Sequence, residues 1–397
     1  MKYDVVVVGS GPAGSVTAGY AAKAGANVLI LERRTEVGVP VLCGEGISKN
    51  VDNFEMLKGT TRWIANKMDG ARIYSPDGTR VTLAAERAGN ETGYVTYRDI
   101  FDQTLAQTAM KWGAELQLNT NVTGLLMEKG RIAGVTAQHF DEKIEINADI
   151  IVGADGVESR VGRWAGIKTT LKPIDLETCA QYMLTNVDVE KEFCHFYVGK
   201  KYAPGGYVWI FPKAKDVANV GIGVLASLSE SGLALRLLDT FIASHPGLKH
   251  GQPLRLLAGA DPVAEPVESV RDHLVLVGDA ARQVDPITGG GLTMSLEGGK
   301  IAGEVIGNAV NQHRFDRDFL SEYERRWQSA YARKLKRNYM VKEIFLGFDD
   351  KTLNMLADSL KDYNFNEINT LGLVKALVAK HPTLLMKLSP LLKLSTV

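Results

Sequence analysis

The stretch that most constrains the fold is the glycine-rich turn that follows the first apolar run. Residues 3–8, Tyr-Asp-Val-Val-Val-Val, predict a buried parallel strand, and the Ala-rich residues 15–24 beyond the turn predict a helix. Gly9 permits a tight turn, Gly11 lets the backbone approach a pyrophosphate, and Gly14 lets the helix pack on the strand. Free N–H groups at the helix N-terminus would bind the anion. The stretch therefore predicts a dinucleotide site.

An acid at the end of the next strand strengthens this prediction. Residues 27–31 predict a second strand, and Glu32 follows at its carboxyl end. A carboxylate at that position accepts hydrogen bonds from ribose hydroxyls and repels a 2′-phosphate. The alternative is a glycine-rich turn that binds nothing, and it does not explain why an acid and a second strand follow at this spacing.

The composition argues against several classes of protein. The chain has 397 residues, enough for two or three packed units, and a net charge of zero argues against a nucleic-acid binder. Cys43, Cys179 and Cys194 lie far apart in sequence, so we expect no disulfide framework, no metal site and a reducing, cytoplasmic setting. The first strand begins at the N-terminus, and no apolar run approaches ~20 residues. We therefore expect neither a signal peptide nor a membrane span.

The order of the predicted elements indicates an α/β fold, α+β overall, with an inserted sheet. A doubly wound, Rossmann-like cofactor domain is predicted from residues 1–70, 98–165 and 266–310. An inserted antiparallel-sheet domain for the substrate is predicted from residues 71–97 and 166–265. The remaining residues, 311–397, predict a helical C-terminal region.

Individual elements follow from periodicity and turn signals. The predicted helices are 99–112, 229–244 and 292–308. The predicted strands of the cofactor domain after residue 100 are 115–122, 130–138, 142–146, 148–153 and 273–277. The predicted strands of the inserted sheet are 71–75, 80–83, 94–97, 178–187, 192–198, 206–211 and 218–223.

Two later strands end in the same kind of sequence as the first. One runs into Gly153-Ala154-Asp155, and the other into Gly278-Asp279, before three glycines that end at Gly291 and a helix that begins at Leu292. Carboxyl ends of parallel strands face one crevice in a doubly wound sheet. Taken singly, Asp279 could cap a helix and the glycines could form a plain loop. Together the three strand ends indicate one cofactor site.

On these motifs the chain resembles the FAD-dependent family that contains the aromatic hydroxylases and the geranylgeranyl reductases. The resemblance implies that FAD is the cofactor and that a specific set of residues holds it. The implied contacts are Gly9, Gly11, Ala13 and Gly14 near the pyrophosphate, Glu32 at the adenosine ribose, Arg98 at the phosphate or ribityl region, Val122 at the adenine, Asp279 at the ribityl chain, and Gly291 with Leu292 at the flavin ring. Asp155 is a further expected cofactor-binding residue. Because only one dinucleotide fingerprint is present, electrons would come from a carrier such as ferredoxin or from transiently bound NADPH.

Two stretches resemble the geranylgeranyl reductases in particular. One is Pro40-Val41-Leu42-Cys43-Gly44-Glu45-Gly46, and the other is 207–212, with the pattern Y-x-W-x-F-P. By alternation Tyr207, Trp209 and Phe211 share one face of a strand, where they either line a site for an isoprenoid chain or fill an ordinary core. The resemblance favours the first interpretation. Further residues expected at the substrate are Pro212, Leu335, Leu371 and Gly372.

The first of these stretches contains the candidate catalytic residues, Cys43 and Glu45. In the family that the chain resembles, Cys43, Gly44 and Gly46 border the flavin. Cys43 is interpreted as a group that orients substrate, relays a proton or tunes the flavin ring, or else as a small residue packed on the flavin. Glu45 either donates a proton, if burial raises its pKa, or caps the adjoining turn.

The resemblance implies a reductase that saturates C=C bonds of geranylgeranyl chains in archaeal ether phospholipids or their precursors, with hydride from reduced flavin. One alternative is a flavin monooxygenase that uses NAD(P)H and O2, and another is a lipid-binding flavoprotein with a structural FAD. An electron-transfer flavoprotein of the iron–sulfur type would need more cysteines. The basic residues from Arg325 to Lys342, and the lysines of 371–394, suit either peripheral contact with an anionic membrane or a solvated helix face.

Overall fold

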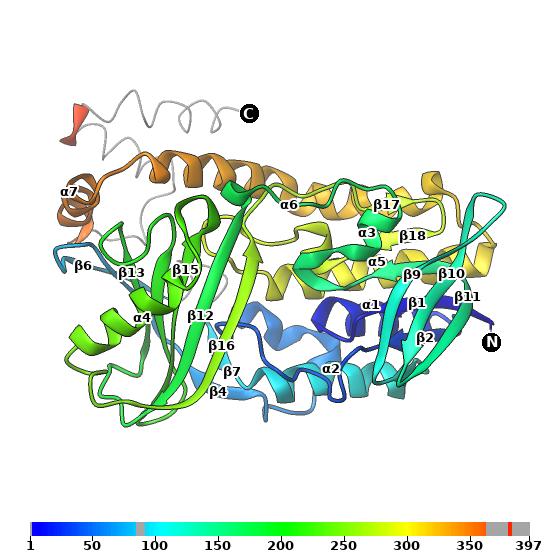
Figure 1. Cartoon of the computed structure of the whole chain (residues 1–397), viewed down its shortest axis with the longest axis horizontal. Helices are drawn as coiled ribbons and strands as arrows, with labels where there is room; N and C mark the ends of the chain where they lie inside the picture. The colour runs from blue at the N-terminus through cyan, green and yellow to red at the C-terminus, as the bar shows by residue number, and fades with distance from the viewer. Residues whose placement is uncertain (1, 85–91, 363–379, 383–397) are drawn as a thin grey trace.

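The computed structural model describes residues 2–84, 92–362 and 380–382. Two large sheets lie side by side, and one long helix runs along both (Figure 1). Leu371, Gly372 and nearly all of the helical segment predicted at 371–394 lie outside the described residues.

The first sheet is Rossmann-like. Its strands are β1 (Lys2–Val8), β2 (Val28–Leu31), β8 (Glu115–Gln117), β9 (Thr120–Glu128), β10 (Arg131–His139), β11 (Glu142–Gly153), β17 (Val270–Arg271) and β18 (Leu274–Leu276). They lie in the order β17-β18-β11-β1-β2-β8, and the strands from β18 to β8 are parallel. β9 and β10 continue from β11 as antiparallel strands. The carboxyl ends of β18, β11, β1 and β2 therefore meet at one edge.

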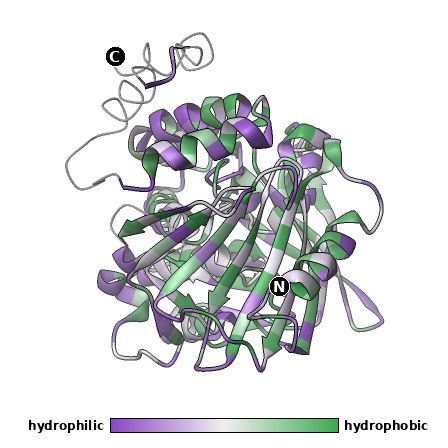
Figure 2. Ribbon diagram, turned by 90° about the vertical axis from the view of Figure 1, so that its left-hand side faces the viewer, coloured by the Kyte–Doolittle hydropathy of each residue, from purple (hydrophilic) through white to green (hydrophobic). Residues whose placement is uncertain are grey.

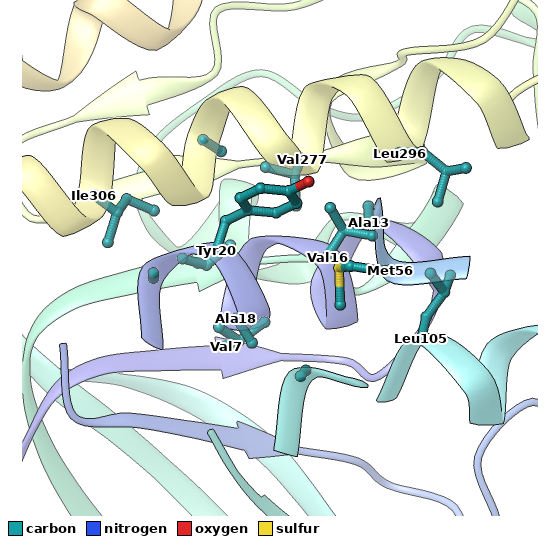
Figure 3. Packing of buried hydrophobic residues seen from close by; sticks show 14 of the residues in the cluster. Val7, Ala13, Val16, Ala18, Tyr20, Met56, Leu105, Val277, Leu296 and Ile306 are labelled. Carbon is teal, nitrogen blue, oxygen red and sulfur yellow. The ribbon is translucent and has the colours of Figure 1, made fainter. Parts of the chain in front are cut away.

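The two faces of this sheet are covered differently. Val5 and Val7 of β1 pack against α1 (Pro12–Lys23), α2 (Arg98–Lys111) and α5 (Leu292–Gln312), a cluster shown in Figure 3. Val6 and Val8 face a second cluster, built with β9, β10 and the short helix α3 (Arg160–Trp164). Alternation along β1 thus supplies both cores from four consecutive valines.

Glycines of α5 let α1 approach it closely. A Cβ at Gly299 would lie 2.7 Å from the carbonyl oxygen of Ala13, and one at Gly303 would lie 2.6 Å from that of Thr17. The two glycines are four residues apart and so share one helix face. This packing brings the first turn of α1 close to the beginning of α5.

The second sheet lies on the left in Figure 1. Its strands are β5 (Gly70–Tyr74), β6 (Arg80–Ala84), β12 (Leu176–Thr185), β13 (Phe193–Val198), β14 (Tyr207–Pro212), β15 (Val217–Leu225) and β16 (Gln252–Pro262). Their order is β16-β12-β15-β14-β13-β5-β6, and all neighbouring pairs are antiparallel except β13 with β5. Figure 2 views this end of the molecule and shows hydrophobic and hydrophilic residues interleaved along the strands.

Alternation separates the two faces of this sheet. Val208 and Ile210 of β14 pack in a cluster with α4 (Leu233–Ser244), whereas Tyr207, Trp209 and Phe211 point to the opposite side. The second face is therefore the one turned toward the cofactor sheet.

Smaller elements connect the sheets. A three-stranded sheet in the order β3-β7-β4 contains β3 (Gly46–Ile47), β4 (Ile64–Lys67) and β7 (Tyr94–Thr96). The 3₁₀ helices are η1 (Lys49–Asn53), η2 (Glu55–Leu57), η3 (Gly156–Glu158), η4 (Pro173–Asp175), η5 (Ala226–Leu228) and η6 (Gly278–Ala281).

The long helix is α6 (Arg317–Leu346), followed by α7 (Asp350–Leu360). On the cofactor side, the Tyr323 hydroxyl donates to the carbonyl of Leu276 at 3.0 Å. On the substrate side, the Tyr339 hydroxyl donates to Asp175 at 2.7 Å, and Lys342 Nζ donates to the carbonyl of Ile174 at 2.9 Å. The helix therefore joins the two sheets.

The predicted fold class is confirmed, and several element boundaries differ. β16 was not predicted, because Pro253 and Gly259 interrupt its apolar pattern; an edge strand tolerates both residues. Segments 142–146 and 148–153 form one strand, β11, while 115–122 divides into β8 and β9 near Asn119, which has a left-handed φ of 50°. The helix predicted from 229 begins only at Leu233, since Gly232 before it is also left-handed.

Candidate active site

A cavity of about 220 Å³ lies between the two sheets. The loop Leu42–Gly46 and Arg98 line one part, and the loop Thr288–Leu292 with Asp279 lines another. The remaining wall comes from β12, β14 and β16 of the second sheet. Residues separated by more than two hundred positions thus surround one space.

The glycine turn after β1 approaches this cavity through Pro12, which lines it. Gly9 has a φ of 106°, and a Cβ there would lie 2.4 Å from the carbonyl oxygen of Ala154. A Cβ at Gly14 would lie 2.0 Å from the carbonyl oxygen of Gly9. Only glycine fits either position, because each contact is shorter than real Cβ contacts allow.

Glu32, at the end of β2, holds this turn in place. Its Oε2 accepts hydrogen bonds from the backbone N–H of Ser10 at 2.9 Å and from the Ser10 hydroxyl at 2.7 Å. Its Oε1 accepts from the backbone N–H of Arg34 at 3.0 Å. The carboxylate is buried and fixes the two strand ends relative to each other.

The ends of β11 and β18 bring two further carboxyl groups to the same edge of the sheet. Asp155 accepts through Oδ2 from the backbone N–H of Val161 at 3.0 Å, while its buried Oδ1 has no partner among the described residues. The side chain of Asp279 lines the cavity, and no described group donates a hydrogen bond to it. Burial raises the pKa of Asp279, although Arg98 opposes the shift.

The loop before α5, residues 285–291, is held by hydrogen bonds within the loop and by one hydrogen bond from α6. The Gly289 N–H donates to the Asp285 carbonyl at 2.8 Å, and the Asp285 N–H donates to the Gly290 carbonyl at 3.1 Å. Asn338 of α6 donates to the Asp285 carboxylate at 2.7 Å. Gly291 then forms the N-cap of α5, so that the helix N-terminus points into the site.

Arg98 is partly buried at the cavity and bound by Asp102 through two hydrogen bonds, of 2.9 and 3.0 Å. Burial by itself lowers the pKa of Arg98, but the neighbouring Asp102 and Cys43 outweigh it and raise the pKa overall. Cys43 accepts a hydrogen bond at Sγ from the backbone N–H of Glu45 at 3.2 Å. Burial raises the pKa of Cys43 while Arg98 opposes the shift, so this residue is a neutral thiol at neutral pH.

Glu45 anchors the loop to both neighbouring elements. Its backbone is left-handed, with a φ of 75°, and its side chain is buried. Oε2 forms an ion pair of 2.6 Å with the buried Lys213 and accepts from Asn219, while Oε1 accepts from the backbone N–H of Arg98 at 3.0 Å. Both carboxylate oxygens are therefore engaged, and one of them caps the beginning of α2.

The aromatic strand is connected to the Cys43 loop by hydrogen bonds. The indole N–H of Trp209 donates to Gln181 Oε1 at 2.7 Å, and Gln181 Nε2 donates to the carbonyl of Cys43 at 3.0 Å. Trp209 lies over Gly221, where a Cβ would be 2.3 Å from the ring. The Tyr207 hydroxyl donates to the carbonyl of Thr288 across the cavity.

β12 contributes a row of three polar side chains, Glu177, Cys179 and Gln181, which line the cavity. Their spacing of two residues places them on one face of the strand. Burial raises the pKa of Glu177 to about 7, with Lys342 opposing, and burial also raises the pKa of Cys179. Both groups are therefore protonated for much of the time near neutral pH.

The described residues contain neither a candidate metal site nor a membrane-spanning helix. No group of His, Cys, Asp and Glu in this part of the chain could hold a metal ion. No helix within residues 2–84, 92–362 and 380–382 is both long enough and apolar enough to cross a membrane.

Two family models match the chain. The geranylgeranyl reductase catalytic domain matches residues 175–260, and the FAD dependent oxidoreductase family matches residues 4–203. Digeranylgeranylglycerophospholipid reductase 2 of Methanococcoides burtonii is 43% identical over 98% of this chain and 96% of its own length. The corresponding reductase of Thermoplasma acidophilum is 40% identical over 98% and 99% of the two chains. The chain belongs to the geranylgeranyl reductase family of FAD-dependent oxidoreductases.

Solved structures agree with this membership. A geranylgeranyl bacteriochlorophyll reductase-like protein of Thermoplasma acidophilum has a TM-score of 0.91 and 40% identity, covering 98% of this chain and 99% of that one. A flavin-dependent brominase has a TM-score of 0.70 at 17% identity, covering 96% of this chain and 99% of its own, and so shares the fold alone. The predicted family, fold class and FAD cofactor are confirmed.

The structure brings most of the predicted site residues of this reductase together. Those that line the cavity are Cys43, Gly44, Glu45, Gly46, Arg98, Tyr207, Trp209, Phe211, Asp279, Gly291 and Leu292. Val122 packs in the core of the first sheet, and Leu335 is a residue of α6 buried in the cluster that contains Val5 and Val7. Pro212 ends β14, beyond the cavity lining, and its carbonyl accepts a hydrogen bond from Asn66.

Five polar residues of the site were missed from the sequence: Glu177, Cys179, Gln181, Lys213 and Asn219. Polar residues at every second position of 177–181 were a usable signal, because the intervening residues are small or apolar. The pattern alone does not distinguish a solvent face from a cavity face. Lys213 and Asn219 had no local signal, since their function depends on Glu45.

Proposed function

We propose that this chain uses FAD to saturate C=C bonds in the geranylgeranyl chains of an archaeal digeranylgeranylglycerophospholipid. The relatives that match it over nearly their whole length are named for that activity. The observation that carries the proposal is the single cavity, bounded on one side by the strand ends of the cofactor sheet and on the other by Tyr207, Trp209 and Phe211. A cofactor and an apolar substrate would meet there.

The residues present fit FAD. Gly9 and Gly14 pack tightly on the backbone, whereas a Cβ at Gly11 would meet nothing within 4 Å, which leaves space for a pyrophosphate at the turn. The unpartnered Asp155 Oδ1 and the unpaired carboxyl of Asp279 are acceptors for ribityl or ribose hydroxyls, with Glu32 at the adenosine end. When bound and reduced, FAD supplies a hydride equivalent to the substrate.

The helix N-terminus at Gly291 and Leu292 is suited to stabilise the negative charge of a reduced flavin. Two-electron reduction places negative charge on the pyrimidine side of a flavin, and a helix N-terminus contributes roughly half a positive charge and free N–H donors. Arg98, partly buried and paired with Asp102, places a guanidinium group beside Cys43 and Gly44. These groups stabilise the reduced state of the cofactor.

The opposite wall positions the isoprenoid chain and excludes water. Trp209 and Phe211 are buried and present an apolar surface, and the exposed Leu42 lies beside β16 at the rim of the cavity. Orientation matters because an unactivated alkene is a poor hydride acceptor. Glu45 holds the loop that carries Cys43 and Gly44, and the neutral Cys43 thiol packs at the reacting double bond.

Two further proposals concern partners. The reducing electrons come from a protein carrier such as ferredoxin, with NADPH as the alternative, because the sequence contains one dinucleotide fingerprint. Contact with an anionic membrane face uses Arg333, Lys336 and Arg337 of α6. Their basic neighbours Arg325, Arg326 and Lys334 already pair with acids.

Mass spectrometry of the lipid product tests the proposed function. The purified protein is reconstituted with FAD, reduced with dithionite under argon and mixed with digeranylgeranylglycerophospholipid. A gain of two hydrogens per double bond is expected, together with reoxidation of the flavin. A product that forms only in the presence of oxygen would support a monooxygenase, and lipid binding without flavin reoxidation would support a non-catalytic flavoprotein.

A further inference from the structure

One carboxyl group that lines the cavity has no role in the proposed function. Glu177 of β12 lines the cavity and is only 8% exposed. Within the described part of the chain, its carboxyl group makes no hydrogen bond and no ion pair. An ionised carboxylate without a partner is costly to bury, so this group stays protonated or meets a ligand.

The neighbouring strands leave room for this side chain. A Cβ at Gly223 of β15 would lie 2.5 Å from Glu177 Oε2, and a Cβ at Gly206 would lie 3.3 Å from Oε1. Gly223 is the register partner of Tyr207, the first aromatic residue of the substrate wall. The carboxyl group is therefore next to the surface on which the isoprenoid chain is proposed to lie.

Several charged and titratable groups surround Glu177. They are Lys342 of α6, Asp175 of η4, Asp261 of β16 and Cys179 of β12. Lys342 Nζ donates to the carbonyls of Ile174 and Val263 and lies 3.8 Å from Asp175 Oδ1. Its ion-pair partner is therefore Asp175 and not Glu177. Burial, opposed by Lys342, raises the pKa of Glu177 to about 7.

The other candidate acids are less suited to give up a proton. Both oxygens of Glu45 are occupied by Lys213, Asn219 and the N–H of Arg98. The pKa of the Cys43 thiol is raised by burial, which makes the thiol a weaker acid than a carboxyl group. Glu177 alone among these three combines a free carboxyl group with exposure to the cavity.

We propose that Glu177 is a catalytic acid that donates the proton completing alkene saturation, an inference that rests on the proposed function. One alkene carbon gains the hydride and its electron pair. The π bond breaks, and the second carbon takes the proton from the Glu177 carboxyl group, whose O–H bond breaks. Two C–H bonds form, the two electrons come from the reduced cofactor, and the Glu177 carboxylate is reprotonated by solvent.

Single turnovers of the dithionite-reduced holoenzyme with digeranylgeranylglycerophospholipid, followed from pH 5 to 9, test this inference. The wild-type rate is expected to fall as pH rises through about 7. Glu177→Gln is expected to be about 100-fold slower or more, without that break, because general acids contribute about 10²–10⁴-fold. Glu177→Asp keeps the acid and is expected to keep the break at an intermediate rate. Glu142→Gln, on an exposed hairpin, serves as the matched control and should behave as wild type.

Infrared spectroscopy provides a readout that does not depend on turnover. Wild-type holoenzyme at pH 5 should show a carboxylic-acid C=O stretch that disappears near pH 7 and is missing from Glu177→Gln. FAD content and melting temperature show whether each variant is folded. If Glu177→Gln does not fold, the inference is tested by Glu177→Asp and by the infrared titration of the wild type.

Two outcomes would overturn the inference. If wild type saturates the lipid and Glu177→Gln matches its rate and pH profile, Glu177 is not the acid although the proposed function stands. If wild type gives no saturated product at any pH, the proposed function itself fails and the inference falls with it.

Discussion

The two walls of the cavity each contain a buried glutamate, and their surroundings are opposite. On the loop wall, Glu45 is held by Lys213, Asn219 and the N–H of Arg98. On the sheet wall, Glu177 faces the cavity with no partner among the described residues. Burial alone therefore does not determine what a carboxyl group does. The paired group fixes a loop, and the unpaired group keeps a proton that it is able to give away.

The strongest test of this contrast removes the cation beside Glu45. Lys213→Met is expected to lower the free energy of unfolding by about 3–5 kcal/mol, because it leaves a buried charge uncompensated. Denaturant unfolding monitored by fluorescence and flavin absorbance measures the loss. The double variant Lys213→Met/Glu45→Gln should recover part of it. Unchanged stability of the single variant would mean that the ion pair does not hold the loop.

The pH dependence of stability tests the other glutamate. Because the pKa of Glu177 is about 7 when folded and 4.5 ordinarily, the folded protein binds this proton more tightly than the unfolded chain does. Stability is therefore lost as pH rises from about 4.5 to 7, by roughly 3 kcal/mol in full. Glu177→Gln should lack this loss when its unfolding free energy is compared with that of wild type at pH 5 and 8. Parallel curves for the two proteins would refute the raised pKa.

A glycine substitution tests the space reserved for Glu177. Gly223→Ala would place a Cβ 2.5 Å from Glu177 Oε2 and is expected to cost about 2 kcal/mol of stability through overpacking. The cost should shrink in a Glu177→Ala background, which a double-mutant cycle measures. Gly259→Ala is the control, because its nearest neighbour would be Leu42 at 3.9 Å. Equal losses for the two glycines would show that Gly223 has no special relation to the acid.

The smallest expected effect concerns a hydrogen bond within the sheet wall, from Trp209 to Gln181, whose amide in turn donates to the Cys43 loop. Trp209→Phe removes the donor to Gln181 and is expected to cost about 1 kcal/mol of unfolding free energy. Trp164→Phe, at a half-exposed site on α3, is the control. In turnover assays, Trp209→Ala should impair long isoprenoid chains more than short ones. Equal impairment of both would argue against an apolar wall that contacts the whole chain.

The cofactor side of the site could be predicted from the sequence because the motifs that mark it lie close together in the chain. Strand, turn and helix follow one another within residues 2–23, and Gly9 and Gly14 are required by contacts inside that unit or with the adjacent strand end. Asp155 and Asp279 follow their own strands directly. Parallel pairing then brings these ends together without further information.

The substrate side could be predicted only in part because its signals are nonlocal. The aromatic alternation of 207–211 predicted a shared face, but the alternation of Glu177, Cys179 and Gln181 gained meaning only when β16 and β12 were placed beside the cofactor loop. The difference between Glu45 and Glu177 depends on Lys213, which is 168 residues away from Glu45. No local sequence pattern predicts that Lys213 pairs with Glu45.

The long helix α6 connects the two halves of the molecule that enclose the cavity. It is bonded to the cofactor half through Tyr323 and Asn338 and to the substrate half through Tyr339 and Lys342. This helix of 30 residues is therefore bonded to both sheets and spans the cavity between them. The width of the cavity therefore depends on α6, although no residue of this helix lines the cavity.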